Sequence, residues 1–353
     1  MSYMKSSLLL PQTIVKHYKI IREISRGGMG VVYLCQDLKV QRNVALKIIL
    51  VDDVNEQKIL TKRFIQEVKI VAHLNYPNIA KIYDYGVYQG VPYFVMEYIE
   101  GMPILEYVQR FAKDNFRVQL NLMLELAKTL SYIHSKRIIH RDIKPSNILV
   151  RKNGKPVLLD FGLAKLYQSS TKLTQIGMII GSLYMSPEQA KDEREKINAR
   201  SDIYSLGAVF YEMTTGCAPV QGENMIQVLN DIIYTSPPLP SSVNPKVPKV
   251  FDVIISKAMA KDYNARYFSS KILANDLDRI LNAKARKSQK RVKSNINQNP
   301  QQVPPNEPKN VSGTERQLHL PVYVPEDKID DNTLLWIFFL FIIGLLLIFL
   351  MIT

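Results

Sequence analysis

Residues 138–149 bring together side chains of several chemical kinds. An imidazole, a guanidinium, a carboxylate, an amine and a carboxamide stand within eight positions between apolar flanks: His140, Arg141, Asp142, Lys144 and Asn147. These side-chain types serve general acid–base chemistry, and a solvated loop does not combine them in this way. A second carboxylate, in Asp160-Phe161-Gly162, follows eighteen residues after Asp142 and directly behind the apolar stretch 156–159. The spacing indicates that the two segments belong to one site.

A glycine-rich turn precedes these segments and could receive phosphate groups. Residues 25–33 read Ser-Arg-Gly-Gly-Met-Gly-Val-Val-Tyr, and glycines let backbone N–H groups approach a phosphate without side-chain interference. The turn lacks the Gly-Lys-Ser or Gly-Lys-Thr ending of a P-loop. A strand follows it where a dinucleotide fingerprint requires a helix. Taken alone, the turn is more typical of a plain β-hairpin.

Lys47 and Glu67 are candidates for a pair of opposite charges near the phosphates. Lys47 ends the apolar stretch 44–47, where a strand-edge lysine that reaches solvent is the simpler interpretation. Glu67 follows twenty residues later on a predicted helix, and a solvated helix face is its simpler interpretation. A lysine near nucleotide phosphates needs an acidic partner to fix its geometry, and Glu67 is the candidate.

Hydrophobic periodicity predicts a β-rich start and a helix-rich remainder. A period of two predicts strands at 18–23, 31–36, 44–50, 79–85 and 93–98. Helical spacing predicts helices at 61–74, 118–134, 202–215, 225–234, 250–260 and 272–283. We therefore expect an α+β fold with a small sheet lobe and a larger helical lobe.

Charge and cysteine content narrow the class of protein. Lys and Arg exceed Asp and Glu by 46 − 32 = 14, which suits nucleic acid, anionic lipid or nucleotide phosphates without choosing among them. Only Cys35 and Cys217 are present, which excludes a disulfide framework and fits a reducing compartment. The first ten residues hold three leucines, too few apolar residues for the core of an export signal.

Two further segments follow the globular part. Residues 284–333 begin with a basic cluster at 284–293 and continue with many prolines and asparagines, which predicts a linker. Residues 334–352 contain no charged or amide side chain. As a helix they would span roughly 28 Å, close to the ~30 Å core of a bilayer. We predict a transmembrane helix there, and a buried core helix is the alternative.

The order of these motifs resembles that of the protein kinase family. The segments GGMG, HRDIKPSNIL and SPEQA are most similar to the bacterial eukaryotic-like serine/threonine protein kinases. The resemblance implies a bilobal protein kinase fold over residues 18–283, with ATP and Mg²⁺ as cofactors and Mn²⁺ as an alternative metal. An N-terminal tail at 1–17 would precede this domain, and the linker and C-terminal transmembrane anchor would follow it.

The resemblance assigns roles to individual residues. Asp142 would accept the proton of the substrate hydroxyl, and Lys144 would stabilise charge on the transferring phosphoryl group. Asn147 and Asp160 would hold the metal. Lys47, held by Glu67, would pair with the α- and β-phosphates. The other residues expected around the nucleotide are Ser25, Arg26, Gly27, Gly28, Gly30, Val32, Ala45, Met96, Glu97, Ile99 and Leu149.

The resemblance also implies a framework and two departures from the family pattern. Glu188 would form a buried ion pair with Arg266, and Asp202 would brace the catalytic loop. Ser25 stands where the family has its first glycine, which restricts φ and weakens nucleotide binding. Residues 181–188 are one position shorter than the family pattern, so substrate preference is the least transferable property.

Regulation is expected at the loop between Asp160 and Glu188. Arg141 beside the catalytic aspartate offers a cationic pocket that a phosphate on this loop can fill. Thr171 and Thr174 are the candidate phosphosites, and ordinary solvated hydroxyls are the alternative.

We predict a non-specific serine/threonine protein kinase that phosphorylates proteins and other copies of itself. It would be a single-pass membrane protein, attached through residues 334–352, with its kinase domain in the cytoplasm. A catalytically weak or dead pseudokinase that acts as a membrane-tethered scaffold is the alternative, and retention of Lys47, Asp142, Asn147 and Asp160 argues against it. A small-molecule kinase is a second alternative, which Lys144 disfavours. No nucleic-acid partner is expected, because the basic cluster lacks interleaved aromatic residues.

Overall fold

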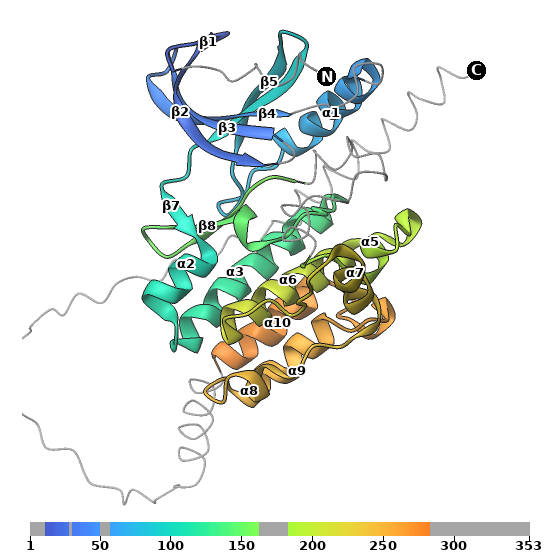
Figure 1. The fold of residues 1–353 in the computed structure, drawn as a ribbon. Coiled ribbons are helices and arrows are strands. Elements are labelled where there is room, and N and C mark those ends of the chain that lie inside the picture. The colour runs from blue at the N-terminus through green and yellow to red at the C-terminus, as the bar shows by residue number, and fades with distance from the viewer. Residues whose placement is uncertain (1–10, 28–29, 50–56, 162–182, 283–353) are drawn as a thin grey trace, which may run out of the picture. The chain divides into compact units, whose positions relative to one another are not determined.

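The structure is a computed structural model that describes residues 11–27, 30–49, 57–161 and 183–282. By its internal contacts the chain divides into two units, residues 1–296 and 297–353. All described residues lie in the first unit, and the architecture below is that of this unit (Figure 1).

An antiparallel sheet of six strands, with one helix beside it, forms the first part of the described chain (Figure 1). Its strands lie in the order β1-β2-β3-β4-β6-β5. Their bounds are Ile14–Val15, Tyr18–Gly27, Gly30–Asp37, Arg42–Ile49, Ile82–Tyr88 and Val91–Glu97 for β1 to β6. Helix α1 (Gln57–Ala72) contacts β5 and β6. The structure thus places a short strand, β1, within the residues predicted as an N-terminal tail.

Side-chain alternation along β4 decides which way its lysine faces. Leu46 and Ile48 belong to a small core on one side of the sheet. Ala45 and Ile49 belong to the main core, to which α1 also contributes. Because successive strand residues point to opposite faces, Lys47 lies on the side of Ala45 and Ile49. The alternation of β4 therefore turns Lys47 toward the main body of the molecule.

The second part is helical and packs around two long helices. Helix α3 (Phe116–Ser135) contacts both α6 (Ala199–Thr215) and α10 (Ser270–Leu281), and α6 also contacts α9 (Lys249–Ala258). The shorter helices are α2 (Ile104–Tyr107), a π-helix at Val108–Ala112, α5 (Pro187–Ala190), α7 (Met225–Tyr234) and α8 (Pro240–Val243). Turns of 3₁₀ type occur at Pro145–Asn147, Arg194–Lys196 and Tyr263–Ala265.

Helix α6 has clear sequence signals at both ends. The side chain of Asn198 accepts a hydrogen bond from the backbone N–H of Arg200 at 2.8 Å, which caps the first turn. Gly216 ends the helix in the left-handed region, with φ 83°. Residues 201–211 are buried without interruption. This helix therefore runs through the interior and can hold other segments in place.

A three-stranded sheet connects the two parts. It consists of β7 (Gly101–Pro103), β8 (Ile148–Arg151) and β9 (Pro156–Leu158) in that order, all antiparallel. Leu158 accepts a hydrogen bond at its carbonyl from the N–H of Ala80, 3.0 Å away, just before β5. Since β8 follows Asn147 and β9 precedes Asp160, this sheet carries both predicted catalytic segments.

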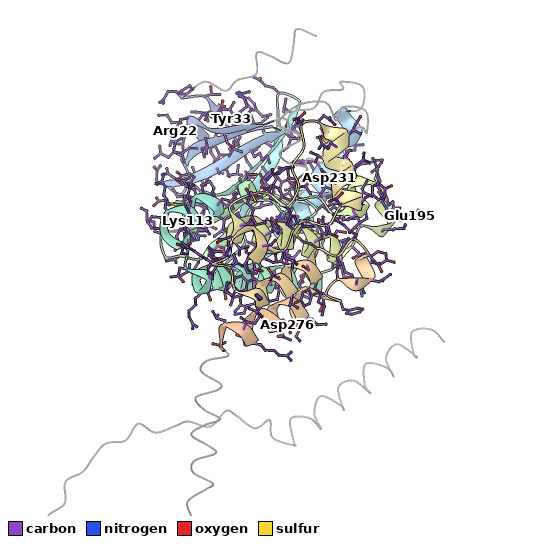
Figure 2. The ribbon with its side chains drawn as sticks, turned by 60° about the horizontal axis from the view of Figure 1, so that its bottom comes forward. Arg22, Tyr33, Lys113, Glu195, Asp231 and Asp276 are labelled. Atoms are coloured by element: carbon purple, nitrogen blue, oxygen red, sulfur yellow. The ribbon has the colours of Figure 1, made fainter. Side chains whose placement is uncertain are left out.

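The predicted α+β fold with a small sheet lobe and a larger helical lobe is confirmed by this arrangement (Figure 1). The predicted strands and helices recur with shifted ends; the helix predicted at 61–74, for example, spans Gln57–Ala72. Exposed charged side chains such as Arg22, Lys113 and Glu195 lie around the outside, as Figure 2 shows.

The predicted membrane location requires a correction. Among the described ranges, no helix combines the length and the apolar character needed to cross a bilayer. Helix α3 has 20 residues, but Arg117, Glu125 and Lys128 interrupt its apolar surface. The prediction of a single-pass membrane protein is contradicted by this finding. Residues 284–333 and 334–352, predicted as linker and transmembrane helix, lie outside the described residues.

Candidate active site

Asp202 of α6 holds the segment that carries the predicted catalytic residues. Its carboxylate accepts hydrogen bonds from the backbone N–H groups of His140, at 2.8 Å, and Arg141, at 2.9 Å. The Nε2 atom of His134 lies 2.8 Å from the same carboxylate. Burial alone would raise the pKa of Asp202, but the bonds from His134 and His140 hold that pKa below its usual value. The predicted bracing role of Asp202 is confirmed.

The ring of His140 lies inside the same loop. Complete burial lowers the pKa of His140 below its ordinary value, although Asp202 and Asp142 oppose this shift. The neutral ring accepts from the N–H of Asp142 at Nδ1, over 3.3 Å. Its Nε2 lies 2.9 Å from the carbonyl of Leu159 and must therefore carry the proton, since a carbonyl only accepts. His140 thus links the backbone at Asp142 to the residue that precedes Asp160.

Asp142, Lys144 and Asn147 converge on one carboxylate. The Asp142 side chain is buried, with 9% of its surface exposed. Its Oδ2 receives a hydrogen bond from Nδ2 of Asn147 at 2.8 Å and lies 2.9 Å from Nζ of Lys144. The same Nδ2 donates to the backbone carbonyl of Asp142 at 2.8 Å. The carboxylate is therefore oriented by two neighbours on its own loop.

Lys47 and Asp160 meet across the two lobes. Nζ of Lys47 lies 2.7 Å from Oδ2 of Asp160, and both side chains are mostly buried. Asp160 adopts a positive φ of 45°. Glu67 lies on α1, half-buried, and no ion pair joins it to Lys47 among the described residues. The resemblance implied Glu67 as the partner of Lys47; the structure shows Asp160 in that place.

The donor set around Asp160 fits Mg²⁺. Oδ1 of Asp160 is buried and has no hydrogen-bond partner among the described residues. Asn147 uses its amide nitrogen on Asp142, which leaves its carboxamide oxygen for a cation. Mg²⁺ prefers hard oxygen ligands and takes only one or two from the protein when phosphates supply others. The described residues contain no cluster of three His, Cys, Asp or Glu that would hold a metal without such help.

The glycine-rich turn is described on both sides of its tip. Gly27 ends β2 and Gly30 begins β3, and the two are register partners; Gly28 lies outside the described residues. A Cβ atom on Gly30 would stand 2.1 Å from the carbonyl oxygen of Ile48 on β4, so only glycine fits there. Arg26 is engaged locally, because its guanidinium contacts both carboxylate oxygens of Glu23 at 3.1 and 2.7 Å.

Residues predicted to surround the adenine come from both lobes. Val32 on β3 is the register partner of Lys47, and Ala45 on β4 is the register partner of Met96 on β6. Leu149 on β8 packs against the buried side chain of Ile99. The six-stranded and the three-stranded sheets thus both supply apolar walls to the predicted adenine site. A pocket is lined by Ala80, Ile82, Phe94, Met96, Asp160 and Phe161.

Glu97, expected at the adenine edge, has a defined place between the lobes. Its backbone N–H donates to the carbonyl of Lys81 at 2.8 Å. Its side chain forms an ion pair with Arg151 at the end of β8, with Oε1 2.7 Å from NH2. Glu97 therefore joins the sheet lobe to the segment that leads into the helical lobe.

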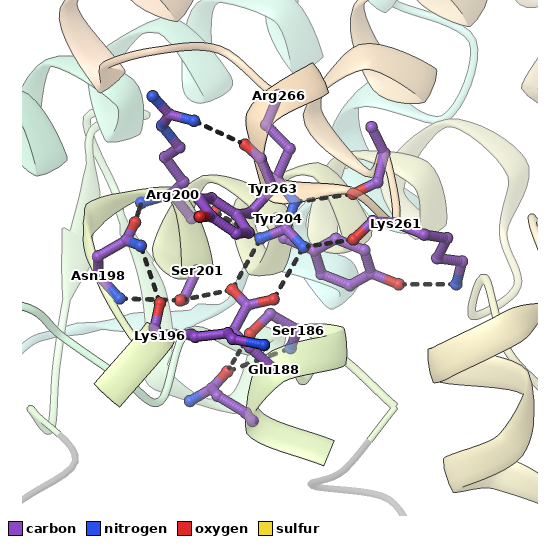
Figure 3. Close-up of polar contacts among 12 residues, drawn as sticks. Ser186, Glu188, Lys196, Asn198, Arg200, Ser201, Tyr204, Lys261, Tyr263 and Arg266 are labelled. Carbon is purple, nitrogen blue, oxygen red and sulfur yellow. Dashed lines mark hydrogen bonds and ion pairs between the residues drawn. The ribbon is translucent and has the colours of Figure 1, made fainter. Parts of the chain in front are cut away.

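The loop between Asp160 and Glu188, called the activation segment below, ends at a buried ion pair. NH1 and NH2 of Arg266 each donate to the Glu188 carboxylate at 2.8 Å, and Ser201 donates to it at 2.6 Å (Figure 3). The predicted Glu188–Arg266 pair is confirmed. Tyr184 donates to the carboxylate of Glu212 on α6. Burial raises the pKa of Glu212, although the bond from Tyr184 opposes this.

Several predicted positions cannot be compared with the structure. Thr171, Thr174 and Ser182 lie outside the described residues, so the candidate phosphosites and the short segment near residue 182 stay predictions.

Sequence reasoning missed three residues that the fold brings to this region. His134 contacts Asp202, Glu212 receives the Tyr184 hydroxyl, and the side chain of Gln189 donates to the carbonyl of Arg141 at 2.9 Å. The spacing of Ser186 and Gln189 is that of a helix capping box, which predicts a cap but not a contact with Arg141.

Comparisons with known proteins agree with this geometry. The sequence model of the family described as protein kinase domain matches residues 18–277. Serine/threonine-protein kinase PrkC of Bacillus subtilis is 36% identical over 277 residues, which cover 78% of this chain and 42% of that protein. Serine/threonine-protein kinase PknB of Mycolicibacterium smegmatis is 34% identical over 276 residues, which cover 76% of this chain and 44% of that protein. The chain thus spans less than half the length of these relatives.

Solved structures show the same fold. The crystal structure of the Mycobacterium tuberculosis PknI kinase domain matches with a TM-score of 0.61 and 23% sequence identity. The match covers 79% of this chain and 99% of that one. At this level of identity the likeness concerns the fold alone.

Proposed function

Because this chain belongs to the protein kinase family, we propose that it transfers the γ-phosphoryl group of ATP to serine and threonine hydroxyls of proteins, itself included. One observation carries the proposal. The buried carboxylate of Asp142 is oriented by Asn147 and Lys144, and Lys47 of the small lobe forms an ion pair with Asp160. A scaffold protein has no need for four polar side chains held in this way.

Asp142 acts as the proton acceptor in the proposed reaction. The O–H bond of the substrate hydroxyl breaks, its proton passes to the Asp142 carboxylate, and the hydroxyl oxygen forms a bond to the γ-phosphorus while the β–γ bridging bond breaks. Lys144, 2.9 Å from Asp142, would also contact the transferred group. The contribution of the protein is mainly orientation and charge, because the transition state of phosphoryl transfer is loose.

Lys47, Asn147 and Asp160 bind and orient the nucleotide in this proposal. Asn147 and Asp160 would hold Mg²⁺, which when bound neutralises charge on the phosphate oxygens. Lys47 would bind the α- and β-phosphates beside the backbone of Gly27 and Gly30. The apolar walls described above would receive the adenine.

The first test compares Asp142→Asn with wild type in a labelled-ATP assay on a general protein substrate. We expect kcat to fall at least about 100-fold, since a positioned base contributes 10²–10⁴-fold. Asp114→Asn is the matched control, because the Asp114 side chain forms an exposed ion pair with Lys246. Equal labelling by wild type and Asp142→Asn would overturn the proposal in favour of the scaffold. Label that enters only small molecules would favour a small-molecule kinase.

A further inference from the structure

Gln189, the third residue of α5, connects this helix to the catalytic loop. Its Nε2 donates to the backbone carbonyl of Arg141 at 2.9 Å. Its Oε1 accepts from the backbone N–H and the hydroxyl of Ser186 at 3.1 and 3.2 Å. One carboxamide thus connects the start of α5 to Arg141, which lies 48 residues before Gln189. The reaction proposed above uses neither contact.

The acceptor of this bond belongs to an unusual stretch of backbone. Arg141 has a φ of 66°, a left-handed conformation that a non-glycine residue keeps only when its surroundings hold it. The N–H of Arg141 donates to Asp202 on α6 at 2.9 Å. The carbonyl of Arg141 accepts from Gln189 on α5. Two different helices therefore hold the two backbone polar groups of this residue.

The same carbonyl belongs to the peptide group that joins Arg141 to Asp142. The N–H of this peptide group donates to Nδ1 of His140 at 3.3 Å. Its C=O accepts from Gln189 on the opposite side. A peptide group bound at both ends cannot rotate without breaking a hydrogen bond. Its orientation sets the direction in which the Asp142 side chain leaves the backbone.

We propose that Gln189 is a positioning residue that acts through the Arg141 carbonyl on the orientation of Asp142. The inference rests on the proposed function, since it assigns Gln189 to the same site. It also couples the end of the activation segment to the catalytic base, because the carboxamide that holds Arg141 is itself held by Ser186. The bond lies near the surface. We therefore expect its loss to lower kcat by a factor of about 2 to 10.

Three substitutions separate the two contacts of Gln189. Gln189→Glu keeps an acceptor for Ser186 but loses the donor to Arg141. Gln189→Lys keeps a donor for Arg141 but loses the acceptor. Gln189→Met keeps neither and adds no charge, so it shows whether any effect of Gln189→Glu is electrostatic.

We expect Gln189→Glu and Gln189→Met to lower kcat about 3- to 10-fold, with KM for ATP within twofold of wild type. Gln189→Lys should restore most of kcat. A capping role alone would give the opposite order, because only Gln189→Glu retains the bond to Ser186. The matched controls are Gln227→Glu and Gln227→Met, since Oε1 of Gln227 caps α7 by accepting from the Glu223 N–H at 3.3 Å.

A second measurement does not depend on activity. Amide hydrogen exchange of Arg141 and Asp142, followed in the full chain, should accelerate about 3- to 10-fold in Gln189→Glu and Gln189→Met but not in Gln189→Lys. The inference would be overturned if Gln189→Met had the kcat and the amide exchange rates of wild type. It would also be overturned if the kcat of Gln189→Lys were as low as that of Gln189→Met. If the wild-type chain transfers no phosphate, the proposed function fails, and the exchange pattern still decides whether Gln189 holds this peptide group.

Discussion

Among the ion pairs of the described residues, the Glu188–Arg266 pair is the most enclosed. The Arg266 side chain is 0% exposed and that of Glu188 is 5% exposed. Burial by itself raises the pKa of Glu188, but hydrogen bonds from Arg266 and Ser201 hold it below its usual value. This stabilising contribution is present at neutral pH and is lost as the pH falls through the lowered pKa.

Removing one partner of this pair should be strongly destabilising. Arg266→Ala leaves the Glu188 carboxylate buried without its counter-charge, and we expect the free energy of unfolding to fall by about 3–5 kcal/mol. Urea denaturation followed by circular dichroism measures this. Arg279→Ala is the matched control, because Arg279 forms an exposed pair with Asp276, and it should change stability by less than about 1 kcal/mol. If both substitutions lowered the free energy of unfolding equally, burial of the Glu188–Arg266 pair would not be the cause of the loss.

Lys261 should make stability depend on pH in the alkaline range. Its Nζ donates to the carbonyl of Ile232 at 2.7 Å near the end of α7 and lies 3.2 Å from the Tyr204 hydroxyl. Burial first, and then the charge of Arg266, lower the pKa of Lys261 to about 8, while Asp231 opposes the shift. The folded chain therefore releases a proton that the unfolded chain keeps up to about pH 10.5.

Stability should consequently rise with pH between about 8 and 10.5 relative to Lys261→Met, because the unfolded state binds more protons in this window. Denaturation of both proteins at pH 7, 8, 9 and 10 gives the difference in unfolding free energy. We expect that difference to stay level below pH 8 and to increase above it. A difference that decreases or stays level above pH 8 would show that Lys261 keeps its proton when folded.

At the scale of elements, α6 organises the site. Within its first turns it presents Ser201 to Glu188 and Asp202 to the catalytic loop, and near its end it presents Glu212 to Tyr184. Neighbouring positions on one buried helix thus fix the activation segment and the catalytic loop relative to each other. A substitution at Asp202 should therefore change the geometry of the catalytic loop, although Asp202 itself is not proposed to contact the substrate.

Asp202→Asn tests this role. Asparagine replaces one acceptor oxygen by an NH₂ group, which would face the backbone N–H of His140 or Arg141 and leave a buried donor unsatisfied. We expect kcat to fall at least about tenfold and Tm to decrease. The matched control is Asp192→Asn, since the Asp192 side chain forms an exposed ion pair with Arg194. Wild-type kcat in Asp202→Asn would show that the loop keeps its shape without this brace.

At the scale of the whole molecule, the contacts separate residues 1–296 from residues 297–353. All the residues proposed to bind ATP and to catalyse transfer belong to the first unit. A domain with its own core can fold alone when few contacts cross its boundary. A variant that ends at Ile296 should therefore keep the Tm of the full chain and a kcat within about twofold. Thermal unfolding and the labelled-ATP assay measure both, and a large loss of either would show that residues 297–353 take part.

Local patterns in the sequence predicted most of the elements, while the assignment of residues 138–149 as the catalytic segment stays a prediction. Strand alternation from 44 to 50 and helical spacing from 202 to 215 correspond to β4 and α6. The caps of α6 at Asn198 and Gly216 are local as well. Such features depend on residues a few positions apart, so a sequence contains the information directly.

The partners of individual side chains could be predicted only where a family resemblance supplied them. The resemblance implied the pairs of Glu188 with Arg266 and of Asp202 with the catalytic loop, and both are present. It also implied that Glu67 holds Lys47, whereas the structure places Lys47 against Asp160. The position of α1 relative to the sheet decides which carboxylate is within reach, and the spacing of residues does not contain that position.

The sequence by itself determined that a glycine-rich turn, a strand lysine, the polar segment 138–149 and a second aspartate occur in one chain, because these are motifs of neighbouring residues. Only the tertiary structure decided that Lys47 meets Asp160, that α6 holds the catalytic loop, and that Gln189 holds the peptide group before Asp142. These contacts join residues 48 to 113 positions apart. Their geometry follows from how buried surfaces pack together, which is a property of the folded chain as a whole.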